Sequence, residues 1–208
     1  MLRPSGTSRT APLRSDADPF RLQGFDYSKE GAYFVTVCTR NRECLFGAVV
    51  DGKMHLNDVG RVVQSVWDGL PERFSAIELD AFVVMPNHIH GIIAVGAPLV
   101  GAQEGTHGDR ATTRVAPTVG NIVGAFKSIT TNEYIRGVKT GSWPPFLDRL
   151  WQRNYYEHVI RSEESLNRIR EYISTNPLRW ALDRENPWRQ GEDEFDRWLA
   201  TFKSRPAE

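Results

Sequence analysis

The alternation of apolar and polar residues divides the middle of the chain into short strands and amphipathic helices. Strands are predicted where β-branched and aromatic residues run without a breaker, and helices where apolar residues recur every three to four positions. The predicted strands are 33–39, 77–85, 88–95 and 150–160, with a hairpin-like excursion over 45–57. The predicted helices are 57–69, 119–136 and 163–176. Asn57 and Ser162 have side chains suited to the N-cap positions of the first and last of these helices.

The predicted elements follow the order strand, helix, strand, strand, helix, strand, helix. Two split β-α units joined by a central hairpin predict an α+β fold, with a ferredoxin-like (RRM-like) antiparallel sheet and helices on one face. Pro177 is expected to end the last helix near Asn176. A fold of this kind carries many unrelated functions, so the function has to be argued from particular residues.

The length of 208 residues suits one domain with flexible ends. Residues 1–22, rich in Ser, Thr, Pro, Ala and Arg, are predicted to form a flexible arm, and residues 97–118 a long surface loop. The domain itself is predicted to span 23–180. The tail, 181–208, is acidic but contains aromatic residues, which predicts that it packs back on the domain.

Charge is balanced over the whole chain but uneven along it. The formal net charge is zero, which argues against a simple polycation that coats nucleic acid. Between residues 110 and 179, however, 11 Lys and Arg face 6 Asp and Glu, so a local basic surface could attract phosphate. Charges scattered over solvated helices would give the same count.

The chain has few features of an exported or membrane protein. Cys38 and Cys44 are its only cysteines, too few for a disulfide framework or a cysteine-rich zinc site. No apolar run approaches the roughly 18 residues of a membrane helix, and the N-terminus has no apolar stretch typical of a secretory signal. A cytoplasmic location, associated with the nucleoid, is therefore expected.

Two histidines open one of the predicted strands. His88 and His90 are two residues apart, so both imidazoles leave the same face while Ile89 and Ile93 take the other. Paired imidazoles can hold a divalent metal if a third ligand arrives from elsewhere. A satisfied polar pair, or chance, would give the same pattern. The position of the pair, directly after a strand and a turn, favours a metal that substrate can reach.

A second polar pair lies on the last predicted helix. Tyr172 and Asn176 are one turn apart and, with Arg168, form a polar ridge beside an apolar stripe. Such a tyrosine is usually an interface residue, and an asparagine before proline usually marks a helix end. The alternative places the phenol beside the metal and gives it the Asn176 oxygen. Two imidazoles and an oxygen suit Mg²⁺ or Mn²⁺ better than structural zinc.

These pieces together resemble the HUH family, in which a His-hydrophobic-His strand and a tyrosine helix build one metal site. Several further segments are similar to REP-associated tyrosine transposases, single-tyrosine relatives of the insertion-sequence transposases. The matching stretches are MPNHIHGII (85–93), EYISTNP (171–177), YFVTVCTRNR (33–42), AFKSITTNEY (125–134) and WQRNYYEHVIR (151–161). The resemblance runs from about residue 22 to residue 180.

The resemblance implies an HUH endonuclease fold and metal-dependent cutting and rejoining of single-stranded DNA. It places His88 and His90 at the two His ligand positions, and Asn176 at a third position that is Gln or Asn in relatives. Tyr172 takes the nucleophile position and would form a 5′-phosphotyrosine with a free 3′-hydroxyl. Such a linkage keeps the energy of the broken bond, which fits the absence of an ATP-binding Gly-x4-Gly-Lys-Ser/Thr loop.

The implied partner is hairpin-forming repeat DNA with a single-stranded flank, bound by a monomer or a homodimer. Stacking faces and phosphate contacts are expected from Lys127, Arg149, Arg153, Tyr155 and Arg168.

Three alternatives remain open from the residues themselves. A His-x-His metallohydrolase or oxygenase would need a third ligand, commonly a carboxylate, and would not need Tyr172. A non-catalytic DNA- or RNA-binding module would keep the basic surface without the chemistry. Tyr155 or Tyr156, in a predicted strand near His158, could also be the nucleophile. Tyr172 is favoured because its helix also supplies Asn176.

Overall fold

The computed structural model describes residues 31–96 and 117–202. The predicted arm over 1–22 and nearly all of the predicted loop over 97–118 lie outside the described residues.

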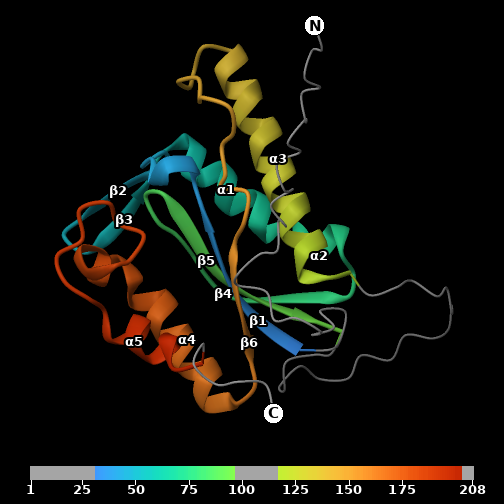
Figure 1. Ribbon diagram of the computed structural model, residues 1–208. Coiled ribbons are helices and arrows are strands. Elements are labelled where there is room, and N and C mark those ends of the chain that lie inside the picture. Colours follow the sequence, from blue (N-terminus) through green and yellow to red (C-terminus); the bar gives the residue numbers. More distant parts are fainter. Residues whose placement is uncertain (1–30, 97–116, 203–208) are drawn as a thin grey trace, which may run out of the picture.

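A four-stranded antiparallel sheet forms the centre of the fold (Figure 1). Its strands are β1 (Gly31–Cys38), β4 (Ile77–Val84), β5 (His88–Val95) and β6 (Tyr156–Ile160), in the order β4-β5-β1-β6. A separate hairpin is formed by β2 (Gly47–Val50) and β3 (Lys53–Leu56). The order of the four strands is that of a ferredoxin-like sheet, so the predicted α+β fold class is confirmed.

The helices form a layer on each face of the sheet (Figure 1). Helices α1 (Asp58–Asp68) and α3 (Val119–Lys139), which connect the strands, pack together on one face, as predicted. Helix α4 (Glu163–Thr175) follows the last strand and covers the opposite face, where the prediction placed no helix. The remaining helices are short: α2 (Leu70–Arg73), α5 (Glu194–Ala200) and the 3₁₀ turns η1 (Arg40–Arg42) and η2 (Asn176–Leu182).

The alternation of side chains along the strands explains why both faces are covered. Tyr33 and Ile89 point into the larger core, which they share with α1 and α3. Phe34 is one position after Tyr33, and Ile92 is three positions after Ile89, so both point to the opposite face. There they share a second core with Ile169 of α4. Central strands of this sheet are thus apolar on both faces, and α4 buries the face that α1 and α3 leave uncovered.

The strand predicted over 150–160 is shorter in the structure, because β6 begins at Tyr156. The segment before it makes other bonds. The ammonium of Lys127 donates to the carbonyls of Gln152, Arg153 and Asn154, at 3.0, 3.0 and 3.2 Å. Only an isolated bridge joins this segment to the end of β1, between Thr39 and Trp151. The carbonyls of 152–154 are therefore satisfied by a side chain instead of a neighbouring strand.

In the described parts of the chain, no helix combines the length and the apolar character that crossing a membrane requires.

Candidate metal centre and tyrosine site

The two histidines stand at the start of β5, on the face that α4 covers. Their side chains are buried, and their Nε2 atoms are 3.0 Å apart. Two ligand atoms about 2.1 Å from one octahedral ion would be separated by about 3.0 Å. The alternation of the strand therefore brings both imidazoles to one point with a spacing that suits a shared ion.

Asn87 decides which nitrogen of His88 is free. Its side-chain nitrogen donates to the carbonyls of Arg42 and Glu185, at 3.1 and 2.7 Å, which fixes the orientation of the amide. Its Oδ1 then faces Nδ1 of His88 at 2.8 Å and can only accept, so Nδ1 carries the hydrogen. The Nε2 atom of His88 is left as a lone pair directed at His90, the arrangement a metal ligand needs.

His90 is held in the same way by a hydroxyl. Its Nδ1 lies 2.8 Å from Oγ1 of Thr36, on the neighbouring strand β1. A hydroxyl can donate or accept, so Thr36 serves either tautomer of His90. In the tautomer with hydrogen on Nδ1, both Nε2 lone pairs face each other at 3.0 Å and repel, unless a cation lies between them.

A carboxylate from beyond the last predicted helix completes the cluster. Oδ2 of Asp183 is 3.7 Å from Nε2 of both His88 and His90, and the three side chains form a buried group able to hold a metal ion. Burial alone would raise the pKa of Asp183, but the two imidazoles and a hydrogen bond donated by the Asn176 side chain outweigh it and hold that pKa well below its usual range. The carboxylate is therefore charged.

Asn176 is oriented toward the same point. Its Nδ2 donates to Oδ2 of Asp183 at 2.8 Å, and its buried Oδ1 has no hydrogen-bond partner among the described residues. A buried amide oxygen without a partner costs free energy, about 1–3 kcal/mol, that a metal or water ligand would recover. The donor set of His88, His90, Asp183 and Asn176 thus fits a divalent cation with oxygen and nitrogen ligands.

The electrostatics of His88 favour the same conclusion. Burial lowers the pKa of His88 to about 4, although the nearby Asp183 acts in the opposite direction. At neutral pH the imidazole is uncharged, which is the form that binds metals.

Tyr172 lies directly beside this cluster. Its hydroxyl is 3.3 Å from Nε2 of His90 and 3.3 Å from Oδ2 of Asp183, to which it donates. Burial and the charge of Asp183 raise the pKa of Tyr172 well above its ordinary value, so the phenol is protonated at neutral pH. The ring stacks on Phe195 of α5, with centroids 3.7 Å apart. In this arrangement the phenol has a hydrogen-bond acceptor and a cation-binding cluster within reach but is covered from solvent.

The two alternative candidates for the nucleophile, Tyr155 and Tyr156, are placed differently. Tyr155 packs against the core on the α1 and α3 side of the sheet, and its hydroxyl donates to Glu157 at 2.8 Å. Tyr156 packs on the α4 side, where burial raises its pKa to about 12 and Arg184 lies over its ring. His158 contacts Phe202 and Trp198, two aromatic residues of the tail.

The structure brings some of the residues predicted to bind DNA together: Lys127 contacts both Arg153 and Tyr155. Arg149 and Arg153 line one surface pocket, which does not include Lys127, Tyr155 or Arg168. Lys127 bonds the three backbone carbonyls described above and lies over the Tyr155 ring. Arg168 pairs with Glu194 of α5 and lies over Trp198. These contacts give Lys127 and Arg168 structural roles that the sequence did not indicate.

Asp183 was not identified from the sequence, and no periodic pattern marks it. It follows Pro177 in a stretch where acidic residues outnumber basic ones, beyond the predicted domain boundary at residue 180. The only local signal is its distance of 11 residues from Tyr172 and seven from Asn176, since a turn after the helix can bring such a residue back. Here η2 is that turn.

Fold and site together define an α+β protein with a buried centre of two histidines and one carboxylate beside a tyrosine. No protein-family model matches the chain. An uncharacterised protein of Haemophilus influenzae is 40% identical over 167 residues, which cover 78% of this chain and 89% of that protein. The chain belongs to the same family as this protein.

Two solved structures are similar to the chain at low identity. A REP-associated tyrosine transposase bound to a REP hairpin has a TM-score of 0.48 and 19% identity, over 89% of each chain. A candidate transposase from Deinococcus radiodurans has a TM-score of 0.43 and 17% identity, over 74% of this chain and 95% of that one.

Proposed function

We propose that the chain is a metal-dependent single-tyrosine enzyme of the HUH type, which cuts and rejoins single-stranded DNA. The observation that carries the proposal is the position of the Tyr172 hydroxyl, 3.3 Å from both His90 and Asp183. A nucleophile adjacent to a cluster that can hold a cation is what phosphodiester transfer through a covalent intermediate requires. The sequence motifs resemble the same enzyme class.

The cation would be held by His88, His90 and Asp183, with the free oxygen of Asn176 as a further ligand. Mg²⁺ or Mn²⁺ suits this mixture of imidazole and oxygen ligands. When bound, the ion withdraws charge from the scissile phosphate and orients it for in-line attack. Asn87 and Thr36 keep the two imidazoles in the ligating orientation.

Tyr172 forms the new bond. Its oxygen attacks phosphorus, the bond between phosphorus and the 3′-oxygen breaks, and the phenolic proton ends on the released 3′-hydroxyl. The product is a 5′-phosphotyrosine, and attack by another 3′-hydroxyl reverses the step with no external energy source. Hydrogen bonding to Asp183 aims the phenolic proton away from the attacking lone pair.

Covalent trapping tests the proposal. The protein is incubated with labelled single-stranded hairpin DNA and Mn²⁺ or Mg²⁺, and a denaturing gel shows whether label becomes attached. We expect an adduct that requires the metal, is lost in Tyr172→Phe and persists in the matched control Tyr155→Phe. Peptide mapping identifies the linked residue. An adduct on Tyr155 or Tyr156 would reassign the nucleophile, and no adduct with any metal would overturn the proposal.

One observation favours a second candidate function. Two histidines and a carboxylate are the ligand set of many metallohydrolases and oxygenases, and Asp183 supplies the carboxylate. Such an enzyme would act on a small molecule without a tyrosine nucleophile. The two functions differ in their response to Tyr172→Phe, which would leave metal-dependent hydrolysis or oxygenation largely intact while abolishing DNA strand transfer.

A further inference from the structure

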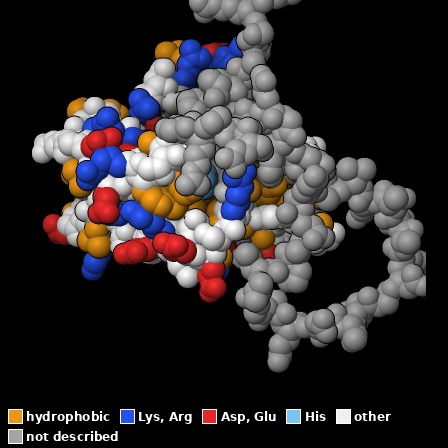
Figure 2. Space-filling view, turned by 60° about the horizontal axis from the view of Figure 1, so that its bottom comes forward, with side chains coloured by type: hydrophobic (Ala, Val, Ile, Leu, Met, Phe, Trp, Pro, Cys, Tyr) orange, Lys and Arg blue, Asp and Glu red, His pale blue; other side chains and the backbone are white. Residues whose placement is uncertain are grey.

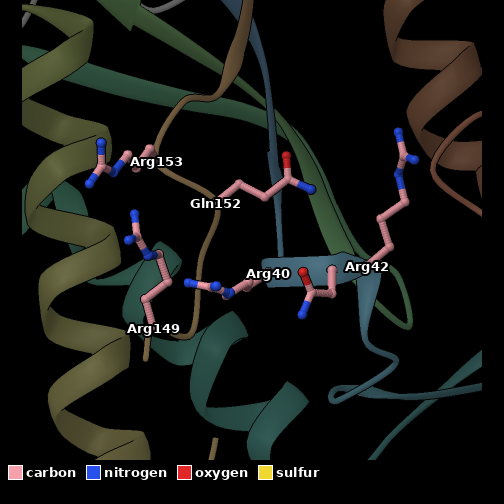
Figure 3. A pocket seen from close by; sticks show the side chains of 6 residues that line it. Arg40, Arg42, Arg149, Gln152 and Arg153 are labelled. Carbon is pink, nitrogen blue, oxygen red and sulfur yellow. The ribbon is translucent and has the colours of Figure 1, made fainter. Parts of the chain in front are cut away.

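A pocket lined by four arginines opens beside the metal centre. Its walls are Arg40, Asn41, Arg42, Arg149, Gln152 and Arg153, and it encloses about 490 Å³. Figure 3 shows the guanidinium groups of Arg40, Arg149 and Arg153 gathered on one side, Arg42 on the other, and Gln152 between them. Two segments far apart in sequence, the η1 turn and residues 149–153, thus line one pocket with their basic residues.

The backbone around this pocket is held in an uncommon conformation. Within the described residues, four non-glycine positions have a positive φ, and three of them belong here: Asn41 at 56°, Arg42 at 56° and Asp148 at 65°. Positive φ is uncommon for a side chain as large as arginine and costs conformational energy. Hydrogen bonds stabilise the turn, from Arg40 N to Leu150 O and from Thr39 Oγ1 to Glu43 O, both 2.8 Å. Strain that is maintained in this way is typical of functional loops.

The pocket has an excess of positive charge that is accessible to solvent. Arg40 and Arg149 share a single partner, Asp148, which is 55% exposed, and Arg42 pairs with Glu185. Arg153 has no ion-pair partner in the part of the chain that the structure describes. Four guanidinium groups thus face two carboxylates. The exposed pairs with Asp148 are weak, so an incoming anion can compete for both arginines.

The pocket and the metal centre share a wall. Asn87 bonds the carbonyls of Arg42 and Glu185 through its nitrogen and His88 through its oxygen. Glu185 in turn pairs with Arg42 at 3.0 Å, and its backbone nitrogen donates to Asp183 at 2.7 Å. A DNA strand bound at the metal centre would therefore meet the arginines directly beyond this shared wall.

We infer that this pocket binds the phosphodiester backbone of the single strand next to the scissile phosphate. Guanidinium groups bind phosphate oxygens in pairs of hydrogen bonds, and they retain their charge in any cellular condition. Gln152 and Asn41 add neutral donors and acceptors that suit sugars and base edges. The inference deepens the proposed function and rests on it, and it extends the predicted DNA contacts of Arg149 and Arg153 to the η1 turn.

The test removes one arginine from each of the two segments, the η1 turn and residues 149–153. Binding of a fluorescein-labelled single strand of mixed sequence is measured by anisotropy, in a Tyr172→Phe background that prevents covalent attachment. Arg40→Gln with Arg153→Gln is compared with the matched control Arg61→Gln with Arg136→Gln. The control removes equal charge from exposed positions on α1 and α3, where Arg61 forms an ion pair with Asp58 and Arg136 forms one with Glu133.

We expect the pocket variant to bind at least about tenfold more weakly than the control. Its slope of log affinity against log salt should also fall by about 1.4, because each lost single-strand phosphate contact accounts for roughly 0.7. Equal affinity and equal slope in both variants would overturn the inference that this pocket binds the DNA backbone. The proposed function is judged separately, by adduct formation in the chain with Tyr172 intact: binding through the pocket without any adduct would reject the enzyme and retain the binding site.

Discussion

The side-chain amide of Asn87 makes three contacts that together select the ligating nitrogen of His88. Asn87 contacts none of the atoms that would bind the metal. It nevertheless connects the η1 turn, the segment that carries Asp183 and Glu185, and His88. The affinity of the site for a metal ion should therefore depend on a residue that does not bind the ion.

Replacing Asn87 by alanine tests this role. We expect Asn87→Ala to lower Mn²⁺ affinity by about 10–100-fold, the usual effect of removing a partner that orients a histidine ligand. Calorimetric titration with Mn²⁺ measures it, with Asn167→Ala as the control, because Asn167 is exposed on α4 and its side chain accepts a hydrogen bond from Arg170, far from the histidines in sequence. Unchanged Mn²⁺ affinity in Asn87→Ala would show that the protein matrix alone orients His88.

The two oxygen donors of the site should differ in importance. Asp183→Asn keeps the size of the side chain and removes its charge, whereas Asn176→Ala removes a neutral oxygen that water can replace. We expect the first variant to bind Mn²⁺ about tenfold more weakly than the second, because ligand charge strongly tunes the affinity for divalent cations. Electron paramagnetic resonance of free Mn²⁺ gives both affinities. The reverse order would make the amide the principal oxygen ligand.

Sequence periodicity predicts most of this site because regular elements carry it. The spacing of His88 and His90 indicates a common face on any strand, and the spacing of Tyr172 and Asn176 a common face on any helix. Asp183 could not be found in this way, because its position depends on a 3₁₀ turn after Pro177 that has no repeating pattern. The pocket was found only in part, since the positive φ angles of Asn41 and Arg42 have no glycine to mark them.

Among the secondary-structure elements, β5 links the metal centre to the larger core. His90 faces α4, and the next residue, Gly91, faces the opposite side, where the Trp67 side chain occupies the space a Cβ would need. Trp67 is buried and stacks on Phe82 of β4, with centroids 4.4 Å apart. The packing of α1 therefore sets the position of the strand that carries both histidines.

Gly91→Ala should be destabilising for this reason. Its Cβ would lie 2.4 Å from Cζ2 of Trp67, too close for contact, so the ring or the strand has to move. We expect a loss of about 1–3 kcal/mol in the free energy of unfolding, as for other overpacked cores. Denaturant unfolding measures the loss. Gly124→Ala is the control, since nothing lies within 4 Å of the added methyl in α3, and it should stabilise by up to about 1 kcal/mol. Equal stability of both variants would contradict the packing argument.

The sequence predicted the three long helices and the strand order correctly but underestimated what lies on the second face. The predicted apolar alternation is satisfied by one helical layer, and nothing in it requires that α4 and α5 pack against Phe34 and Ile92. Helix α5 does have a local signal, since Asp193 caps it and Phe195, Trp198 and Leu199 follow at helical spacing. This signal can be interpreted as a packed helix only once it is known that the second face of the sheet is covered.

The molecule as a whole has three layers, a sheet with helices on each face, and its surface carries interspersed basic and acidic side chains. Basic and acidic side chains lie next to one another on the face shown in Figure 2, in keeping with the zero net charge. Binding of a polyanion then depends on a local concentration of charge such as the arginine pocket. The site itself, between the sheet and α4, is buried, and burial lowers the pKa of His88, so that imidazole is uncharged at neutral pH.

Stability should therefore fall in acid, in a window set by the buried His88 and the half-buried His158. The pKa of His88 and that of His158 are each lowered to about 4 from 6.5, mainly by burial, so the unfolded chain binds protons that the folded chain rejects. Stability is fully present above pH 6.5 and is lost as the pH falls toward 4. For His88 alone the loss approaches about 3 kcal/mol, because each tenfold change in proton affinity corresponds to about 1.4 kcal/mol.

Thermal unfolding in the presence of a chelator measures this loss of stability. The measurements run from about pH 7 to about pH 4, the two ends of the window. His158→Gln should reduce the dependence on pH, and His55→Gln, at an exposed position of β3, should leave it unchanged. A melting temperature that stays level across the window would mean that these two histidines accept protons without disturbing the layers.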